Sequence, residues 1–286
     1  MKWTLGRTML CAIACGLVAG MMPSAQAVSR AEVACVRKEL GASGLSRVRA
    51  AGDNLGRLSA RDRAVLEGCL LTGGGPIGKS SRMPPVLTVS PIDPALVSAM
   101  SRFRSCSGHD YSGRGPDGRV EKNRSMKHYL YLTVPWTQSG AVSVVAPFAG
   151  KAVVSREGAE SIGSWIRVVN PKGWVFTVFH ADPAVRSGQR VSVGQSIATF
   201  PPAEVPARFP DRLAEPQANF DFTLQSTDGR LASFVDHLAP QAEAAWAARG
   251  FTAEAVSIPK SQRDAAPCPA GFLEGPGSVG YVAAAP

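Results

Sequence analysis

Apolar residues recur at helical spacing near the start of the chain and at strand spacing further along. Between residues 29 and 71 the pattern predicts two short helices. Ser29 can cap the first helix and Gly41 can end it, while Ser59 can cap the second. Glycines interrupt the stretch between them, so we expect a helical hairpin with a structural role, similar to a prodomain that caps its neighbour.

From about residue 92 to residue 238 the pattern changes to short strands separated by Gly- and Pro-containing turns. Alternating or continuous apolar runs predict strands at 142–146, 151–154, 165–169, 174–179 and 219–224. The turn at 170–173 joins two of them into a hairpin. Since no long helix interrupts these strands, we predict a mainly β fold with a small antiparallel sheet. One short helix at 240–249 and a Pro/Gly/Ala-rich tail follow.

The first 27 residues have the pattern of a secretory signal peptide. Lys2 and Arg7 precede an apolar run at 8–22, and Ala25-Gln26-Ala27 is a cleavage site. An uncleaved anchor, or a lipoprotein modified at Cys15, is the alternative. No later apolar run reaches the roughly 18 residues of a transmembrane helix. We therefore predict a protein exported to the periplasm or the extracellular space.

These patterns divide the chain into five parts. The predicted parts are a signal peptide (1–27), a helical N-terminal region (28–72), a Pro/Gly-rich linker (73–95), a β domain (96–238), and a helix with a Pro/Gly/Ala-rich tail (239–286).

Cleavage would leave four cysteines, an even number that predicts two disulfides in an exported chain. They are Cys35, Cys69, Cys106 and Cys268. Three pairings are possible. Cys35 and Cys69 each lie in a predicted helix, so their pairing would staple the helical hairpin. Cys106–Cys268 would then tie the tail to the β domain. Their spacing matches no zinc-ribbon pattern.

The formal net charge is +9, and removal of Lys2 and Arg7 leaves +7. The charges are scattered along the chain, which fits either an anionic partner or solubility alone. No nucleic-acid-binding signature is present, so nucleic acid is not an expected partner.

Three segments of the β region, in their order, resemble the lysostaphin/LytM-type peptidoglycan endopeptidases. The first is His128 followed by the run 140–154; the second is His180 followed by 188–197, with Gly-Gln-Arg-Val-Ser-Val-Gly-Gln-Ser-Ile; the third is 219–223, with Asn-Phe-Asp-Phe-Thr. The resemblance covers about residues 125–225. It implies a hammerhead-like peptidase domain and a zinc ion that activates water against a peptide bond.

Several functional positions of that family are altered in this chain. The resemblance places His128 at the first metal-ligand position and His180 at an assisting position. Leu132 stands where the family has a ligand aspartate, Asp221 replaces a ligand histidine, and Asn219 replaces an assisting histidine. Leucine cannot bind a metal ion, so the zinc site is degenerate by sequence.

One segment offers compensation for the missing ligands. His109 and Asp110 lie in a glycine-flanked loop that follows Cys106. If this loop covers the site, His109 could join His128 and Asp221, with Asp110 or His180, in a mixed nitrogen and oxygen site.

Two functions are therefore favoured over a third possibility, a purely structural exported protein. The first is an exported cell-envelope protein with a degenerate LytM-like domain, which binds peptidoglycan or another anionic envelope component, or regulates there, without hydrolysis and without a cofactor. The second is an active zinc endopeptidase with a rebuilt site of His109, His128 and Asp221, assisted by His180. No signature of a serine or cysteine hydrolase is present.

Overall fold

The computed structural model describes residues 29–51, 58–75, 83–156, 161–272 and 274–285. The predicted signal peptide lies outside the described residues, as do residues 76–82 of the predicted linker. Within the described ranges, no helix is long and apolar enough to cross a membrane.

The N-terminal region forms the predicted helical hairpin from α1 (Arg30–Ala51) and α2 (Ala60–Leu71). At the start of α1, the Ser29 hydroxyl accepts from the Glu32 amide at 3.2 Å, and the Glu32 carboxylate accepts from the Ser29 amide at 2.7 Å. Gly41 has a φ of 71° and kinks α1 at the position predicted to end the first helix. The Ser59 hydroxyl caps α2, and a disulfide joins Cys35 to Cys69.

The rest of the chain is built around a mainly antiparallel eleven-stranded sheet, which confirms the predicted fold class. Its strands are β1 (Val97–Ser101), β2 (His128–Leu132), β3 (Val142–Val145), β4 (Gly150–Ser155), β5 (Ser164–Val169), β6 (Trp174–Pro183), β7 (Arg190–Val191), β8 (Ser196–Phe200), β9 (Asn219–Ser226), β10 (Leu231–Ala232) and β11 (Tyr281–Ala283). Short helices connect or flank them: α3 (Val205–Arg208), α4 (Pro240–Ala247) and α5 (Lys260–Ala265).

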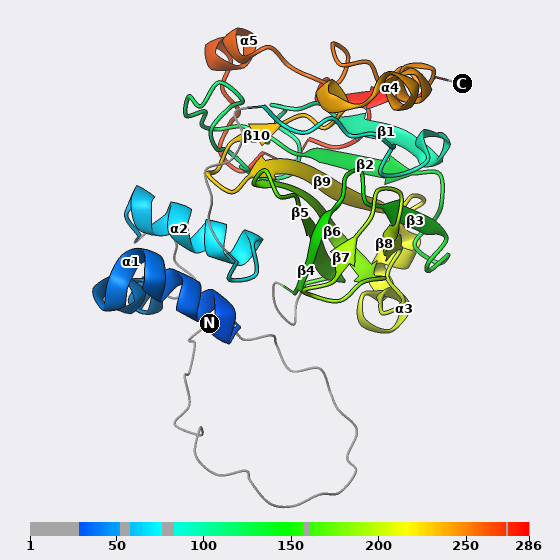
Figure 1. Ribbon diagram of the computed structural model, residues 1–286. Helices are drawn as coiled ribbons and strands as arrows, with labels where there is room; N and C mark the ends of the chain where they lie inside the picture. The colour runs from blue at the N-terminus through cyan, green and yellow to red at the C-terminus, as the bar shows by residue number, and fades with distance from the viewer. Residues whose placement is uncertain (1–28, 52–57, 76–82, 157–160, 273, 286) are drawn as a thin grey trace, which may run out of the picture.

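The main path of the sheet runs β11-β1-β2-β9-β6-β5-β4-β7, and every one of these pairs is antiparallel. β10 pairs with β9, while β3 pairs with β8, which also pairs with the end of β6. Figure 1 shows β3, β7 and β8 beside the long central strands, with α4 near β1. This order places β2, β9 and β6 next to one another at the centre.

One face of the central strands forms the hydrophobic core. Phe220, Phe222 and Leu224 of β9 alternate with polar residues and are almost fully buried. The rings of Phe200 and Phe220 stack with centroids 4.6 Å apart, and Phe176 packs 5.0 Å from Phe222. Period-two alternation therefore fixes which face of β9 points into the core.

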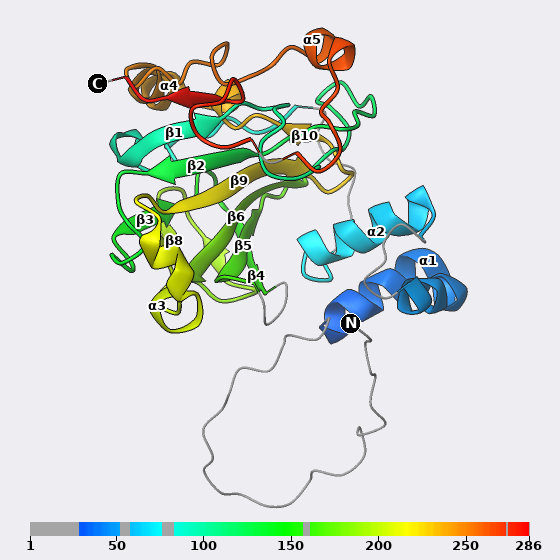
Figure 2. The same cartoon turned by 180° about the vertical axis from the view of Figure 1, so that it is seen from behind.

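The opposite, polar face of the same strands is also covered. Asp221 and Thr223 alternate with the core residues along β9 and point to the opposite face, yet each is only 2% exposed. The segment between β1 and β2 reaches this face, because the Tyr111 hydroxyl donates to the Gln225 side chain at 3.4 Å. Figures 1 and 2 both show α1 and α2 beside the β4–β5 side of the sheet. Burying polar groups costs free energy unless they are paired, so this covered polar face is a candidate functional site.

The C-terminal tail has more structure than its composition predicts. β11 pairs with β1, so residues near the end of the chain complete one edge of the sheet. The second disulfide joins Cys106 to Cys268, 162 residues apart, and both predicted disulfides are thereby confirmed. The tail is thus tied to the β domain by a covalent bond and by strand pairing.

Candidate functional site

A buried ion pair lies on the polar face where β2 meets β9. Asp221 is the register partner of Tyr129, so their side chains share one face of the sheet. Lys127 comes two residues before Tyr129 and therefore projects to the same side. Its ammonium contacts the Asp221 Oδ2 atom, and the two side chains are only 4% and 3% exposed. The sheet thus buries a cation and an anion together.

Three aromatic rings enclose the ammonium of Lys127. Its nitrogen lies 4.8–4.9 Å from the ring centroids of Tyr111, Tyr129 and Phe179. At these distances the negative faces of the rings attract the positive charge. Burial lowers the pKa of Lys127, but attraction from Asp221, with smaller contributions from the tyrosines, outweighs it and raises the pKa above its ordinary value. Lys127 is therefore a permanent cation and a poor nucleophile or base.

His180 stands at the edge of this ion pair and is one-third exposed, with 32% of its side chain accessible. Its Nε2 atom lies 3.6 Å from the Asp221 Oδ1 atom. Its Nδ1 atom lies 3.1 Å from the carbonyl oxygen of Ile162, which can only accept, so Nδ1 carries a proton. In the neutral ring, Nε2 then carries a lone pair, which can accept a hydrogen bond from a ligand that reaches this edge of the ion pair.

The backbone of His180 is strained, with a φ of 63°. Such a conformation is uncommon outside glycine and persists where the surrounding structure enforces it. Gly163 of the neighbouring segment packs closely against this backbone, because a Cβ there would lie 2.6 Å from the His180 carbonyl carbon. The strained backbone of His180 thus lies directly against Gly163, where the absence of a Cβ allows the two backbones to approach closely.

His128 lies on the other face of β2, away from Asp221. Its Nδ1 atom lies 2.8 Å from the Ser101 carbonyl oxygen, and its Nε2 atom lies 3.1 Å from the Ser233 hydroxyl. The ring packs between Phe103 and Phe234 and is 1% exposed. Burial lowers its pKa to about 4, although the bond to Ser101 raises it slightly. The expectation that His128 and Asp221 converge is corrected, since adjacent strand positions face opposite ways.

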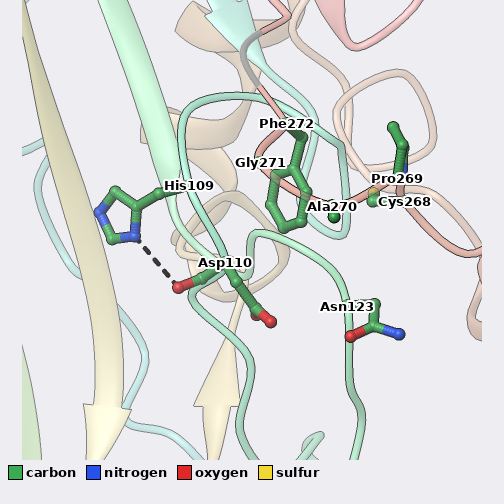
Figure 3. Close-up of a pocket in the computed structure, with 8 residues that line it drawn as sticks. All are labelled: His109, Asp110, Asn123, Cys268, Pro269, Ala270, Gly271 and Phe272. Atoms are coloured by element: carbon green, nitrogen blue, oxygen red, sulfur yellow. Dashed lines mark hydrogen bonds between the residues drawn. The ribbon is translucent and has the colours of Figure 1, made fainter.

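His109 lies in the exposed loop after Cys106, as the sequence predicted, and among the described residues the Asp221 carboxylate forms its ion pairs with Lys127 and His180 instead. The His109 Nδ1–H donates to the Asp110 carbonyl at 3.0 Å. Figure 3 shows this bond at one side of an open groove of about 560 Å³, whose other wall is formed by residues 268–272. The loop does cover the site, but through the ring of Tyr111 rather than through His109.

A zinc ion does not fit the residues proposed to hold it. Both ring nitrogens of His128 have partners on the core face, and the Asp221 carboxylate faces Lys127 and His180. His109 is held by its own loop. Among the described residues there is no group of three or more His, Cys, Asp or Glu side chains that could bind a metal ion. A metal ligand must have a free lone pair directed at the ion, and His128 has none.

Lys127, Tyr111 and Tyr129 were not among the site residues predicted from the sequence. A signal was present, because β2 alternates between core and polar faces: His128, Leu130 and Leu132 are buried in the core, so the odd-numbered positions face the polar side. With Leu130 and Leu132 in the core, the same alternation places Lys127 on the polar face. The aromatic enclosure, in contrast, depends on a loop whose path the sequence does not specify.

Comparisons with known proteins give only structural neighbours. No protein-family model and no curated protein matches the sequence. Several solved structures are similar to parts of it, among them the following three. The M23 metalloprotease pseudoalterin, of deep-sea origin, is 16% identical with a TM-score of 0.32, covering 54% of this chain and 76% of that one.

Two further neighbours have a comparable degree of similarity. A zinc-containing peptidase from Vibrio cholerae is 20% identical with a TM-score of 0.35, covering 53% of this chain and 40% of that one. A chain of the SpoIIQ–SpoIIIAH pore-forming complex is 12% identical with a TM-score of 0.34, covering 55% of this chain and 92% of that one.

Proposed function

We propose that the chain is an exported cell-envelope protein whose LytM-like domain binds peptidoglycan without hydrolysing it. The observation that carries the proposal is the Lys127–Asp221 ion pair. At the position where the resemblance implies a metal ligand, the carboxylate faces a lysine ammonium. A lysine supplies positive charge but cannot activate a bound water molecule as zinc does.

Other features support binding in the envelope. The two disulfides fit an oxidising compartment, and the net charge, +9 for the full chain and about +7 without Lys2 and Arg7, suits an anionic polymer. His180 is partly exposed at the ion pair and held in a strained conformation, which is typical of a side chain positioned for a ligand. We propose that its Nε2 atom accepts a hydrogen bond from the bound peptide or sugar.

Co-sedimentation with purified peptidoglycan sacculi tests this function. We expect the mature chain to sediment with sacculi and to release no soluble muropeptides. His180→Asn should weaken sedimentation about tenfold, because it removes the imidazole while asparagine tolerates the positive φ. His109→Asn is the matched control and should leave sedimentation unchanged, since His109 lies outside the ion pair.

Two results would overturn the proposal. Absence of sedimentation would reject the binding role. Release of muropeptides that His109→Asn or Asp221→Asn abolishes would instead establish the active endopeptidase with a rebuilt metal site.

A further inference from the structure

A row of hydrogen-bond donors crosses the polar face next to the ion pair. Arg167 of β5 is the register partner of Thr177 in β6, and Thr177 is the register partner of Thr223 in β9. Directly paired side chains on one face of a sheet lie about 5 Å apart at Cβ. The three residues therefore form a continuous line across three strands, about 7 Å along the strands from Asp221.

All of these donors are buried, and the two threonine hydroxyls lack acceptors within the described part of the chain. Arg167, Thr177 and Thr223 are 5%, 1% and 2% exposed. The hydroxyls of both threonines have no hydrogen-bond partner among the described residues. The same holds for the indole N–H of Trp165, which shares the face with Arg167. Buried polar groups in native proteins are nearly always paired, so such a cluster requires a partner.

Arg167 also lacks a carboxylate partner within ion-pair distance among the described residues. Its guanidinium donates to the Ser155 hydroxyl at 2.9 Å and lies 5.3 Å from the Trp165 ring centroid. A buried arginine is ordinarily paired with an anion, because burial of an isolated charge is costly. By contrast, Lys127 on the same face already has Asp221. Among the described residues of this face, the buried charge without a counter-ion is therefore the Arg167 guanidinium, not the Lys127 ammonium.

We propose that Arg167, Thr177 and Thr223, with the Trp165 indole, form a subsite for a carboxylate of a bound peptide. All four groups can donate, and a carboxylate is an acceptor-only group with two oxygens that suit a guanidinium. A carboxylate at this place would satisfy the charge and both hydroxyls together. The inference rests on the proposed function, where the ligand is the peptide stem of peptidoglycan, which carries free carboxylates.

The N-terminal hairpin supplies a competing carboxylate. The turn after α2 packs against the sheet, since a Cβ at Gly73 would lie 3.2 Å from Val153, the register partner of Arg167. A Cβ at the next residue, Gly74, would lie 2.6 Å from the Glu32 amide nitrogen. This places the start of α1 beside the row, and the negative charge of Glu32 acts on Arg167. Glu32 and a ligand carboxylate would thus compete for the same guanidinium.

The experiment compares a soluble disaccharide-tetrapeptide from sacculi with the same compound after amidation of its carboxylates, by calorimetric titration of the mature chain. We expect amidation to weaken binding about tenfold or more, the effect of losing one charge-assisted hydrogen bond. Arg167→Gln should abolish the difference between the two ligands. Glu32→Gln, which keeps the N-terminal cap, should strengthen binding of the free carboxylate several-fold.

Thr177→Val and Thr223→Val test the same subsite if Arg167→Gln, which alters a buried arginine, does not fold. Each replacement has nearly the same shape and removes a hydroxyl without a partner, so the unfolding midpoint in urea should stay level or rise. Binding of the free carboxylate should nevertheless fall about fivefold, while binding of the amidated ligand stays unchanged. A purely structural role for the hydroxyls would not produce this split.

The outcomes separate this inference from the proposed function. If sacculi sediment the chain but amidation and both valine variants leave affinity unchanged, the carboxylate subsite is rejected and the binding function stands. If the free-carboxylate tetrapeptide binds through Arg167 while sacculi do not sediment the chain, the subsite stands and the proposed function is rejected. Equal, weak binding of both ligands to every variant rejects the subsite.

Discussion

Replacing Lys127 with methionine should lower the free energy of unfolding by about 3–5 kcal/mol. The methionine fills a similar volume among the three rings, so packing changes little. What changes is that the carboxylate of Asp221, only 3% exposed, loses its cation. An unpaired buried charge is among the most destabilising defects that a single substitution can create.

The double variant Lys127→Met/Asp221→Asn isolates the charge from the packing. It should recover a large part of the lost stability, because no unpaired charge remains. Urea unfolding of the parent, the two single variants Lys127→Met and Asp221→Asn, and the double variant gives the coupling energy between the two side chains. Lys172→Met, in the exposed turn between β5 and β6, is the matched control and should change stability by less than about 0.5 kcal/mol. A Lys127→Met protein as stable as the parent would show that Asp221 does not depend on this ammonium.

The stability contributed by neutral His128 should be lost as the pH falls from about 6.5 to about 4. Burial lowers the folded-state pKa of His128 to about 4, whereas the unfolded value is 6.5. Between these values the unfolded chain binds a proton that the folded chain does not, so acid favours unfolding. At pH 5 the loss relative to pH 7 should be about 2 kcal/mol.

The measurement is the urea unfolding free energy at pH 7 and pH 5 for the parent and for His128→Gln. Asp236 acts in the opposite sense, because burial raises its pKa to about 6 and its folded form gains a proton as the pH falls. The difference between parent and variant removes that shared contribution. Identical pH dependence in both proteins would mean that His128 is not buried as a neutral ring.

Local signals predicted local structure well in this chain. Ser29 and Ser59 cap helices because a hydroxyl before an apolar-periodic run satisfies free backbone amides, and this depends on only a few neighbouring residues. The hairpin between β5 and β6 formed at 170–173 for the same kind of reason, with Gly173 at a φ of 77°. The cysteine count predicted two disulfides, and the structure selects Cys35–Cys69 and Cys106–Cys268 from the three possible pairings.

Long-range pairing was not predictable in the same way. The three residues of β11 form a strand because β1 lies beside them, and nothing within that tail specifies a partner about 180 residues earlier. The prediction of the site residues was wrong by a single position along a strand. A shift of one residue moves a side chain to the other face of a sheet, so His128 was expected where Lys127 and Tyr129 point. Arg167, Thr177 and Thr223 are brought into one row only by the pairing register of β5, β6 and β9, which the sequence does not specify.

Zinc binding by the mature protein tests the central claim most directly. The protein is incubated with excess zinc, passed through a desalting column and analysed for metal and protein, with Asp221→Asn treated in parallel. Because His128 is engaged in the core and Lys127 faces Asp221, we predict far less than one zinc per chain for both proteins, on the order of a tenth or lower. About one zinc per chain in the parent, lost in Asp221→Asn, would contradict the account and establish a metal site at this carboxylate.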